Sequence, residues 1–172
     1  MGLRNHQKSV SLLVETASFL VVRLGRTYLA LPAEGVRGVL TQEEAGSEQA
    51  VTSAGTIYQA VDLVRSLSLT ADLSGFEMRT VLYTSGRSHG AIQVEQVVGL
   101  TDIERKDCLP LPLQFRGDER KWFGGMMVYQ DVLVLIVNPA WVLGELAEVV
   151  SVSDREPQRI VTSSAMSIGG TC

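Results

Sequence analysis

The chain has 172 residues, 45% of them hydrophobic and 20% charged, which is enough apolar material for one domain with a real core. Its formal net charge is −4 and it has no basic run, which argues against a nucleic-acid partner, because phosphate binding needs clustered Lys and Arg. The cysteines Cys108 and Cys172 do not form a disulfide framework, and no window is apolar enough to span a bilayer. We therefore expect a cytoplasmic protein without direct membrane insertion.

The first half of the chain predicts short strands joined by turns and loops. The strands are expected at Phe19–Leu24, Thr27–Leu31 and Ile57–Val61. Gly25–Arg26 supplies a tight turn, and the acidic stretch Thr41–Ala54 predicts a loop. Asp62 is a suitable N-cap for a short helix over Leu63–Leu69. Residues 1–16 are polar and predict a flexible tail.

The second half predicts a similar series. Its strands are expected at Thr80–Thr84, Gly90–Val94, Met126–Tyr129 and Val132–Val137, the last two joined by Gln130–Asp131. Asp102–Asp118 carries two prolines and predicts a connector without regular structure. Asn138–Pro139 predicts the start of a helix that runs to about Val149. Residues 151–172 are rich in Ser, Thr and Gly and predict a disordered tail.

An internal repeat relates the two halves. A shift of 61 positions places Gly25–Arg26 on Gly86–Arg87. The same shift relates further pairs: Leu31 and Ile92, Glu34 and Glu95, Val36 and Val97, Gly38 and Gly99, Val39 and Leu100. Two copies predict a pseudo-symmetric all-β domain, in which each half curls into a small barrel that packs on the other.

No catalytic, cofactor-binding or metal-binding residues are predicted. His6 and His89 have no partners at ligand spacing, and Cys108 has no base nearby in the sequence. Gly124–Gly125 lacks the lysine of a phosphate loop and is expected to be a strand entry where two backbones approach closely. Trp141 is expected in the core, whereas Trp122–Phe123 fits either core or interface.

Four segments carry a resemblance to a known family. They are FLVVRLGRTYLALPAEGVRGVL, YQAVDLVRSLSL, RTVLYTSGRSHGAIQVEQVVGL and WFGGMMVYQDVLVLIVNPAWVL, which together span Phe19 to Leu146. In this order they resemble the chemotaxis coupling-protein (CheW-like) domain. The resemblance implies an all-β fold of two five-stranded, SH3-like β-barrels packed with pseudo-symmetry, with short helices after each half, over residues 17–150.

The resemblance also implies a function. Members of the family are non-enzymatic adaptors of bacterial chemosensory systems and need no cofactor. They couple the tip of a methyl-accepting chemoreceptor to a CheA-like histidine kinase. A small enzyme, as another possibility, would require a polar pocket with convergent titratable groups.

One motif departs from the family pattern. In TSAGTIYQAVDL, Thr52, Ala54 and Gln59 stand where the family has Asn, Arg and Pro, and the preceding loop is short, which predicts a missing or frayed strand. The family Arg is associated with partner contact, and Ala54 has no guanidinium to make a charge-assisted hydrogen bond. A diverged regulator that binds a receptor or pathway partner but not the kinase is therefore the alternative function.

The predicted partner-binding residues follow the two copies of the repeat and this motif. They are Glu34, Val36, Arg37, Val39, Ala54, Gly55, Val97 and Val98. Val36 and Val39, facing Val97 and Val98, would present an apolar stripe for a partner helix in a groove between the barrels. Alternatively, these valines seal the barrels against each other.

Overall fold

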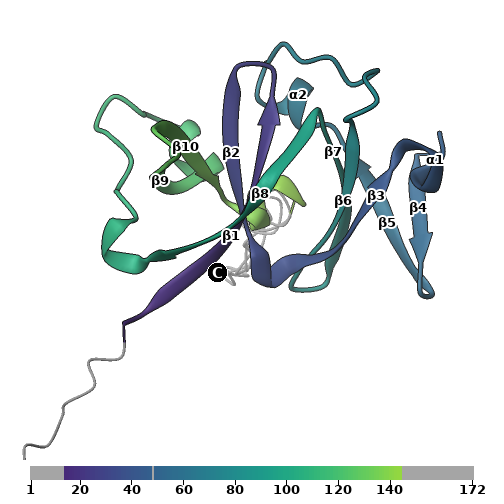
Figure 1. Ribbon diagram of the computed structural model, residues 1–172, viewed down its shortest axis with the longest axis horizontal. Coiled ribbons are helices and arrows are strands. Elements are labelled where there is room, and N and C mark those ends of the chain that lie inside the picture. Colours follow the sequence, from purple (N-terminus) through teal and green to yellow (C-terminus); the bar gives the residue numbers. More distant parts are fainter. Residues whose placement is uncertain (1–13, 48, 145–172) are drawn as a thin grey trace, which may run out of the picture.

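Two five-stranded, curled sheets make up the computed structural model, which describes residues 14–47 and 49–144 (Figure 1). The first sheet has the strand order β8 (Gln96–Glu104), β1 (Thr16–Leu24), β2 (Thr27–Pro32), β10 (Val132–Val137), β9 (Phe123–Tyr129). The second has the order β3 (Val36–Thr41), β6 (Arg79–Ser85), β7 (Ser88–Val94), β5 (Thr56–Val61), β4 (Ala50–Ser53). The short helices are α1 (Gln42–Ala45), α2 (Leu63–Ser66), α3 (Glu119–Trp122), α4 (Pro139–Val142) and the 3-10 turns η1 (Ala33–Gly35) and η2 (Arg105–Asp107). The predicted all-β class of two five-stranded units is confirmed.

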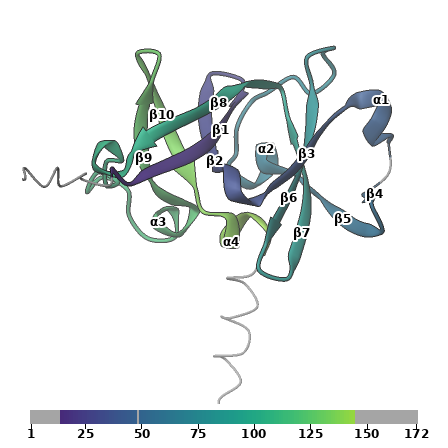
Figure 2. The ribbon, with the colours of Figure 1, turned by 60° about the horizontal axis from the view of Figure 1, so that its bottom comes forward.

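Both sheets follow one plan. Each has a central antiparallel hairpin (β1–β2 or β6–β7), an antiparallel strand on one side of it, and on the other side a parallel neighbour that belongs to an outer hairpin (β9–β10 or β4–β5). Figure 2 shows the two outer hairpins at opposite ends of the molecule. The pseudo-symmetry predicted from the repeat therefore extends to the strand order of the sheets.

The prediction that each half forms its own barrel is wrong, because each half divides its strands between the two sheets. The first half places β1 and β2 in the first sheet and β3, β4 and β5 in the second, whereas the second half places β6 and β7 in the second sheet and β8, β9 and β10 in the first. β3 follows the β1–β2 hairpin in the chain but pairs with β6 in the second sheet, and β8 follows β6–β7 but pairs with β1 in the first (Figures 1 and 2). Both hydrogen-bonding edges of β2 are occupied, by β1 and by β10. The backbone groups of β3 therefore cannot pair with β2 and pair with β6 instead. This division of the strands ties the two sheets into one domain.

β3 and β8 carry matching bulges. The pairing of β3 with β6 shifts register between Val36 and Gly38, and the pairing of β1 with β8 shifts where Val22 opposes Val97 and Val21 opposes Gly99. The inserted residues are Arg37 and Val98, which the 61-residue shift relates to each other. Each bulge bends its strand as it crosses between the sheets.

Three clusters of buried side chains hold the domain together. An inter-sheet core draws on both central hairpins, and its largest fully buried members are Leu24, Leu29, Leu31, Leu63, Tyr83 and Ile92. A first-sheet core lies on the other face of the first sheet, and a second-sheet core on the other face of the second. Alternate residues of β1 enter different cores, which explains why this strand is nearly continuously apolar.

The stretch Thr41–Ala54 is not the loop that its composition predicts. Thr41 and Glu44 form a reciprocal capping box that starts α1, and β4 then pairs with β5. The predicted loss or fraying of a strand here is wrong as well. A four-residue strand of mixed polarity has too short a pattern to be recognised without its partner.

Other local predictions have mixed outcomes. Asp62 and Asn138 cap α2 and α4 as predicted, each through a side-chain oxygen that accepts a backbone hydrogen bond, although α2 ends at Ser66. The connector Asp102–Asp118 is more regular than predicted, since β8 runs to Glu104 and η2 follows. The predicted tails, apart from residues 14–16, and the helix beyond residue 144 lie outside the described residues.

Candidate functional site

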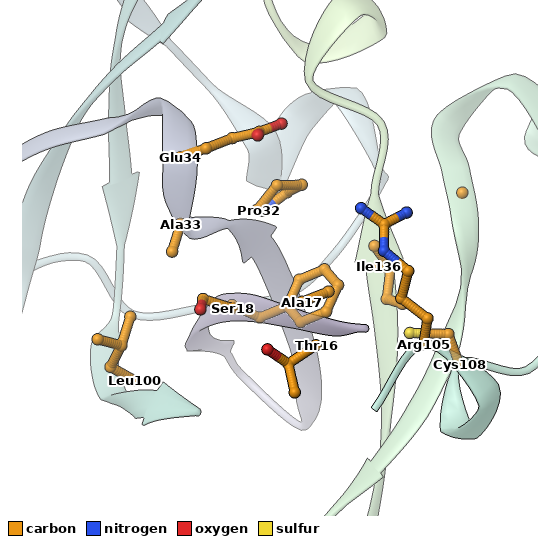
Figure 3. A pocket seen from close by; sticks show the side chains of 12 residues that line it. Thr16, Ala17, Ser18, Pro32, Ala33, Glu34, Leu100, Arg105, Cys108 and Ile136 are labelled. Atoms are coloured by element: carbon orange, nitrogen blue, oxygen red, sulfur yellow. The ribbon is translucent and has the colours of Figure 1, made fainter. Parts of the chain in front are cut away.

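A broad concavity lies beside β1, where η1 carries the chain from the first sheet toward the second. It is a cavity of about 800 Å³, lined by residues from β1, η1, β8, β9, β10 and the segment after β8. Phe19 and Ile136 are buried at its floor, with Ala17, Pro32 and Ala33 beside them. Figure 3 shows Leu100 and Arg105 on opposite sides of this cavity.

The rim of the cavity is polar. Ser18 donates a hydrogen bond to the Asp102 carboxylate, and Arg105 lies 3.8 Å from the Glu15 carboxylate in an exposed ion pair. Glu34 reaches the cavity from η1, and its side chain is exposed (Figure 3). An apolar floor with a few polar groups at the rim is the usual composition of a site that binds an apolar partner surface.

The bulge in β3 places Val36 and Val39 on the same face of the second sheet. Val36 pairs with Tyr83 and Val39 with Val81, and both partners face the inter-sheet core. Val36 packs against that core, whereas Val39 is 40% exposed. Of the two valines, Val39 is therefore the one available to a partner.

The equivalent face of β8 repeats this arrangement. Val97 packs against the inter-sheet core, and Leu100 lies on the same face of the strand, opposite Leu20, with 67% of its surface exposed. Val98 is the inserted residue of the bulge and packs against the first-sheet core. Val36 and Val97 thus help to seal the sheets together, while Val39 and Leu100 remain exposed.

Ala54 and Gly55 form the tip of the β4–β5 hairpin. Both are exposed and both have positive φ, 47° and 80°, as a two-residue hairpin turn of this hand requires. The tip lies away from η1 and the start of β3 in both ribbon views (Figures 1 and 2). Next to it, Thr52 and Ile57 form an exposed cross-strand pair.

The structure therefore separates the predicted partner-binding residues. Glu34 and Arg37 line one cavity, Val39 is exposed farther along β3, and Ala54 and Gly55 form the tip of another hairpin. Leu100 was not among the predicted site residues, although the repeat that relates it to Val39 is a signal in the sequence that could have found it. The floor of the cavity has no such signal, since its residues come from distant segments.

The charged residues Glu34 and Glu95, equivalent in the repeat, have different surroundings. The Glu95 carboxylate accepts hydrogen bonds from the backbone N–H of Gly25 (2.9 Å) and of Asp72 (3.3 Å) and lies 2.9 Å from Arg23 Nη1. The Gly25 hydrogen bond is the main cause that lowers the pKa of Glu95. Glu34 instead lies near the buried Tyr83, where burial first and then the Glu34 carboxylate raise the pKa of the tyrosine to about 12.

The part of the chain that the structure describes has no group of three or more His, Cys, Asp or Glu side chains that could hold a metal ion. Across the same ranges, no helix is long and apolar enough to cross a membrane. Cys108 is half-buried at the edge of the cavity. The cavity, with Phe19 and Ile136 at its floor, is suited to binding a partner surface and is built on a pseudo-symmetric pair of β-sheets.

Comparisons with known proteins identify the family and a similar fold. The model of the CheW-like domain matches residues 18–147, and the chain belongs to this family. The crystal structure of the scaffolding protein TtCheW from Thermoanaerobacter tengcongensis is similar to it, with a TM-score of 0.62 and 13% sequence identity over 80% of this chain and 90% of that chain. At this identity the likeness shows the fold alone. A search of curated proteins found no matching sequence.

Proposed function

We propose that this protein is a non-enzymatic adaptor of a bacterial chemosensory system, which couples the tip of a methyl-accepting chemoreceptor to a CheA-like histidine kinase. Its place would be the cytoplasm, at receptor arrays beneath the inner membrane. The observation that best supports the proposal is the apolar-floored cavity beside Leu100 in a chain of the CheW-like family. An adaptor acts through interface area and a few dominant contacts, so it needs no reacting group.

The receptor would bind along the cavity and the exposed faces of β3 and β8. Val39 and Leu100 offer apolar contacts, and Glu34 and Arg37 offer charges at the edge. An amphipathic helix binds a groove of this kind through apolar residues on one face. Burial of Leu100, which is 67% exposed in the free chain, would then provide a substantial part of the binding free energy.

This assignment is tested by comparing two exposed leucines. Leu100→Asp should weaken binding of a receptor-tip fragment by more than about 30-fold in isothermal titration calorimetry, because the charge would be buried unpaired. Leu113→Asp is the matched control, since Leu113 is 83% exposed and lies outside the cavity. This variant should bind the fragment like the unmodified chain. Equal affinities of the two variants would contradict the assignment of the receptor to this cavity.

The kinase would bind at the β4–β5 hairpin. In the family the position of Ala54 carries an Arg associated with partner contact, and here an exposed alanine stands at the hairpin tip. This substitution favours a second candidate function, a diverged regulator that binds a receptor or pathway partner but not the kinase. The hairpin itself is intact, so the loss would concern one guanidinium rather than the shape of the edge.

A pull-down with the kinase's regulatory domain distinguishes the two functions. If the chain is a diverged regulator, the unmodified protein should retain little kinase, and Thr52→Asn with Ala54→Arg should increase the retained amount at least about tenfold. Strong retention by the unmodified chain would instead support the full coupling function. Ala54→Lys is the control, because it restores a charge without the planar guanidinium.

A further inference from the structure

Glu95 sits in a complete binding arrangement for its carboxylate. Arg23 Nη1 lies 2.9 Å from one carboxylate oxygen and also donates to the carbonyl oxygen of Gly25 at 3.0 Å. The other carboxylate oxygen accepts from the N–H groups of Gly25 and Asp72. The Glu95 side chain is only 19% exposed as a result. We call this arrangement the Glu95 clamp.

The 61-residue shift leads from the Glu95 clamp to an open counterpart. The residues equivalent to Glu95, Arg23 and Gly25 are Glu34, Thr84 and Gly86. All three of these equivalents line one cavity of about 290 Å³, so the fold brings them to one place, although Gly86 and Glu34 are not joined by a hydrogen bond like the one from Gly25 to Glu95.

The counterpart lacks the group that fills the clamp. Thr84 is too short to reach across as Arg23 does, and its hydroxyl is hydrogen-bonded to His89 Nδ1 at 3.0 Å. Glu34 is exposed and makes no hydrogen bond or ion pair with any residue that the structure describes. The carboxylate and the glycine of a guanidinium site are thus present without a guanidinium.

We propose that this cavity binds the guanidinium of an arginine on a partner protein, which takes the place that Arg23 takes at Glu95. The inference rests on the proposed adaptor function, because it assigns the cavity to a protein partner. Arginine fits better than lysine, since Arg23 uses two nitrogens in different directions: Nη1 donates to the carboxylate and to the Gly25 carbonyl, and Nε donates to Gln96 Oε1. By analogy with the clamp, the two acceptors in the open counterpart would be the Glu34 carboxylate and the Gly86 carbonyl.

Arg37 makes the choice of ligand testable. It also lines the cavity and is exposed, so its positive charge opposes the entry of a cation and would favour an anion. If the cavity binds a guanidinium, Arg37→Ala should strengthen the binding and Glu34→Gln should abolish it. If the cavity binds a carboxylate, both changes should act in the opposite direction.

The first experiment introduces the missing side chain within the chain itself. Thr84→Arg is made alone and with Glu34→Gln, and the unfolding equilibrium is measured in urea. We expect the arginine to raise the folding equilibrium constant about 3- to 10-fold more when Glu34 is present than when it is Gln. Arg23→Thr with Glu95→Gln gives the same cycle for the filled clamp as a positive control. A coupling in the clamp cycle but none in the Thr84 cycle would overturn the inference.

The second experiment uses ethylguanidinium as the probe and follows the backbone amide signals by NMR. Saturable shifts at Gly86 are expected with ethylguanidinium, weaker ones with ethylammonium, none in Glu34→Gln, and about 2- to 5-fold tighter binding in Arg37→Ala. Shifts with acetate that disappear in Arg37→Ala would overturn the inference. Since the probe requires no receptor, a failure of receptor binding would count against the proposed function and leave this result standing.

Discussion

The first and second sheets share a backbone plan but differ in what fills them. The first-sheet core consists of Phe19, Val21, Ala30, Met127, Val134 and Ile136, whereas the buried residues of the second-sheet core are Tyr58, Leu82 and Ala91. The 61-residue shift relates Phe19 to Thr80, whose buried hydroxyl has no hydrogen-bond partner among the described residues. The repeat has therefore kept its turns and bulges, which set strand direction, while the side chains inside the two sheets differ.

The Glu95 clamp and its open counterpart differ in the same way. Backbone geometry is shared, since Gly25 and Gly86 both have positive φ, at 61° and 54°. One side chain, Arg23 against Thr84, decides whether the carboxylate is satisfied within the chain or left for another molecule. A pseudo-symmetric fold can thus hold a structural contact in one copy and a binding site in the other.

Making the first-sheet core resemble the second should have the largest effect. Phe19→Thr removes a buried aromatic ring and places a hydroxyl in an apolar core, which should lower the free energy of unfolding by about 3 kcal/mol or more. Urea denaturation followed by tryptophan fluorescence measures the change. Phe19→Leu is the control and should cost about 1 kcal/mol. If Phe19→Thr lowered the free energy of unfolding by less than about 1 kcal/mol, the first-sheet core would not depend on this ring.

The hairpin turns should respond unequally to alanine. Gly25 has φ +61°, and a Cβ there would lie 2.0 Å from the carbonyl oxygen of Thr70, so Gly25→Ala should destabilise the protein by about 2 to 3 kcal/mol. Gly55 has φ +80° but nothing within 4 Å of such a Cβ, so Gly55→Ala should cost only about 1 kcal/mol. Thermal unfolding of both variants tests the difference. Equal losses of stability would show that the backbone around Thr70 moves away from the added Cβ at little cost.

The Glu95 clamp predicts a pH-dependent contribution to stability. Because its pKa is lowered in the folded state, the Glu95 carboxylate stabilises the protein above the unfolded-state pKa, and this stabilisation is lost as the pH falls through the folded-state pKa. Glu95→Gln should cost about 1 kcal/mol at pH 7, and the difference from the unmodified chain should shrink below about pH 4. Glu34→Gln should change stability by less than about 0.5 kcal/mol at either pH. A difference for Glu95→Gln that stays constant with pH would contradict the assignment.

Local chemistry made much of this fold predictable from the sequence. Gly25 turns the chain through its own positive φ, and Asp62 and Asn138 accept hydrogen bonds from backbone N–H groups within three residues, so this turn and these caps follow from residue type alone. β4 could not be predicted this way, because it has only four residues of mixed polarity and the turn after it holds Ala54 at a φ of 47°, which alanine does not favour.

The placement of β3, β4 and β5 in the second sheet and of β8, β9 and β10 in the first is non-local, and so is the floor of the cavity. They depend on which strand edge is free once the central hairpins have paired, and no single segment contains that information. The same reason explains why Leu100 was not predicted as a partner-binding residue. Its sequence position resembles that of Val39, but its exposure is decided by neighbours from β1 and η1.

The last expected effect concerns the buried Thr80 hydroxyl of the second-sheet core, and its sign is the reverse of the others. Thr80→Val keeps the shape of the side chain and removes a buried polar group without a partner in the described structure, so it should raise the free energy of unfolding by about 1 kcal/mol. Thr84→Val is the matched control on the same strand, and it should be destabilising because the Thr84 hydroxyl is hydrogen-bonded to His89. Urea denaturation of both variants gives the comparison. If Thr80→Val were destabilising too, the hydroxyl would have a partner in solution, and the second-sheet core would be better satisfied than its sparse packing indicates.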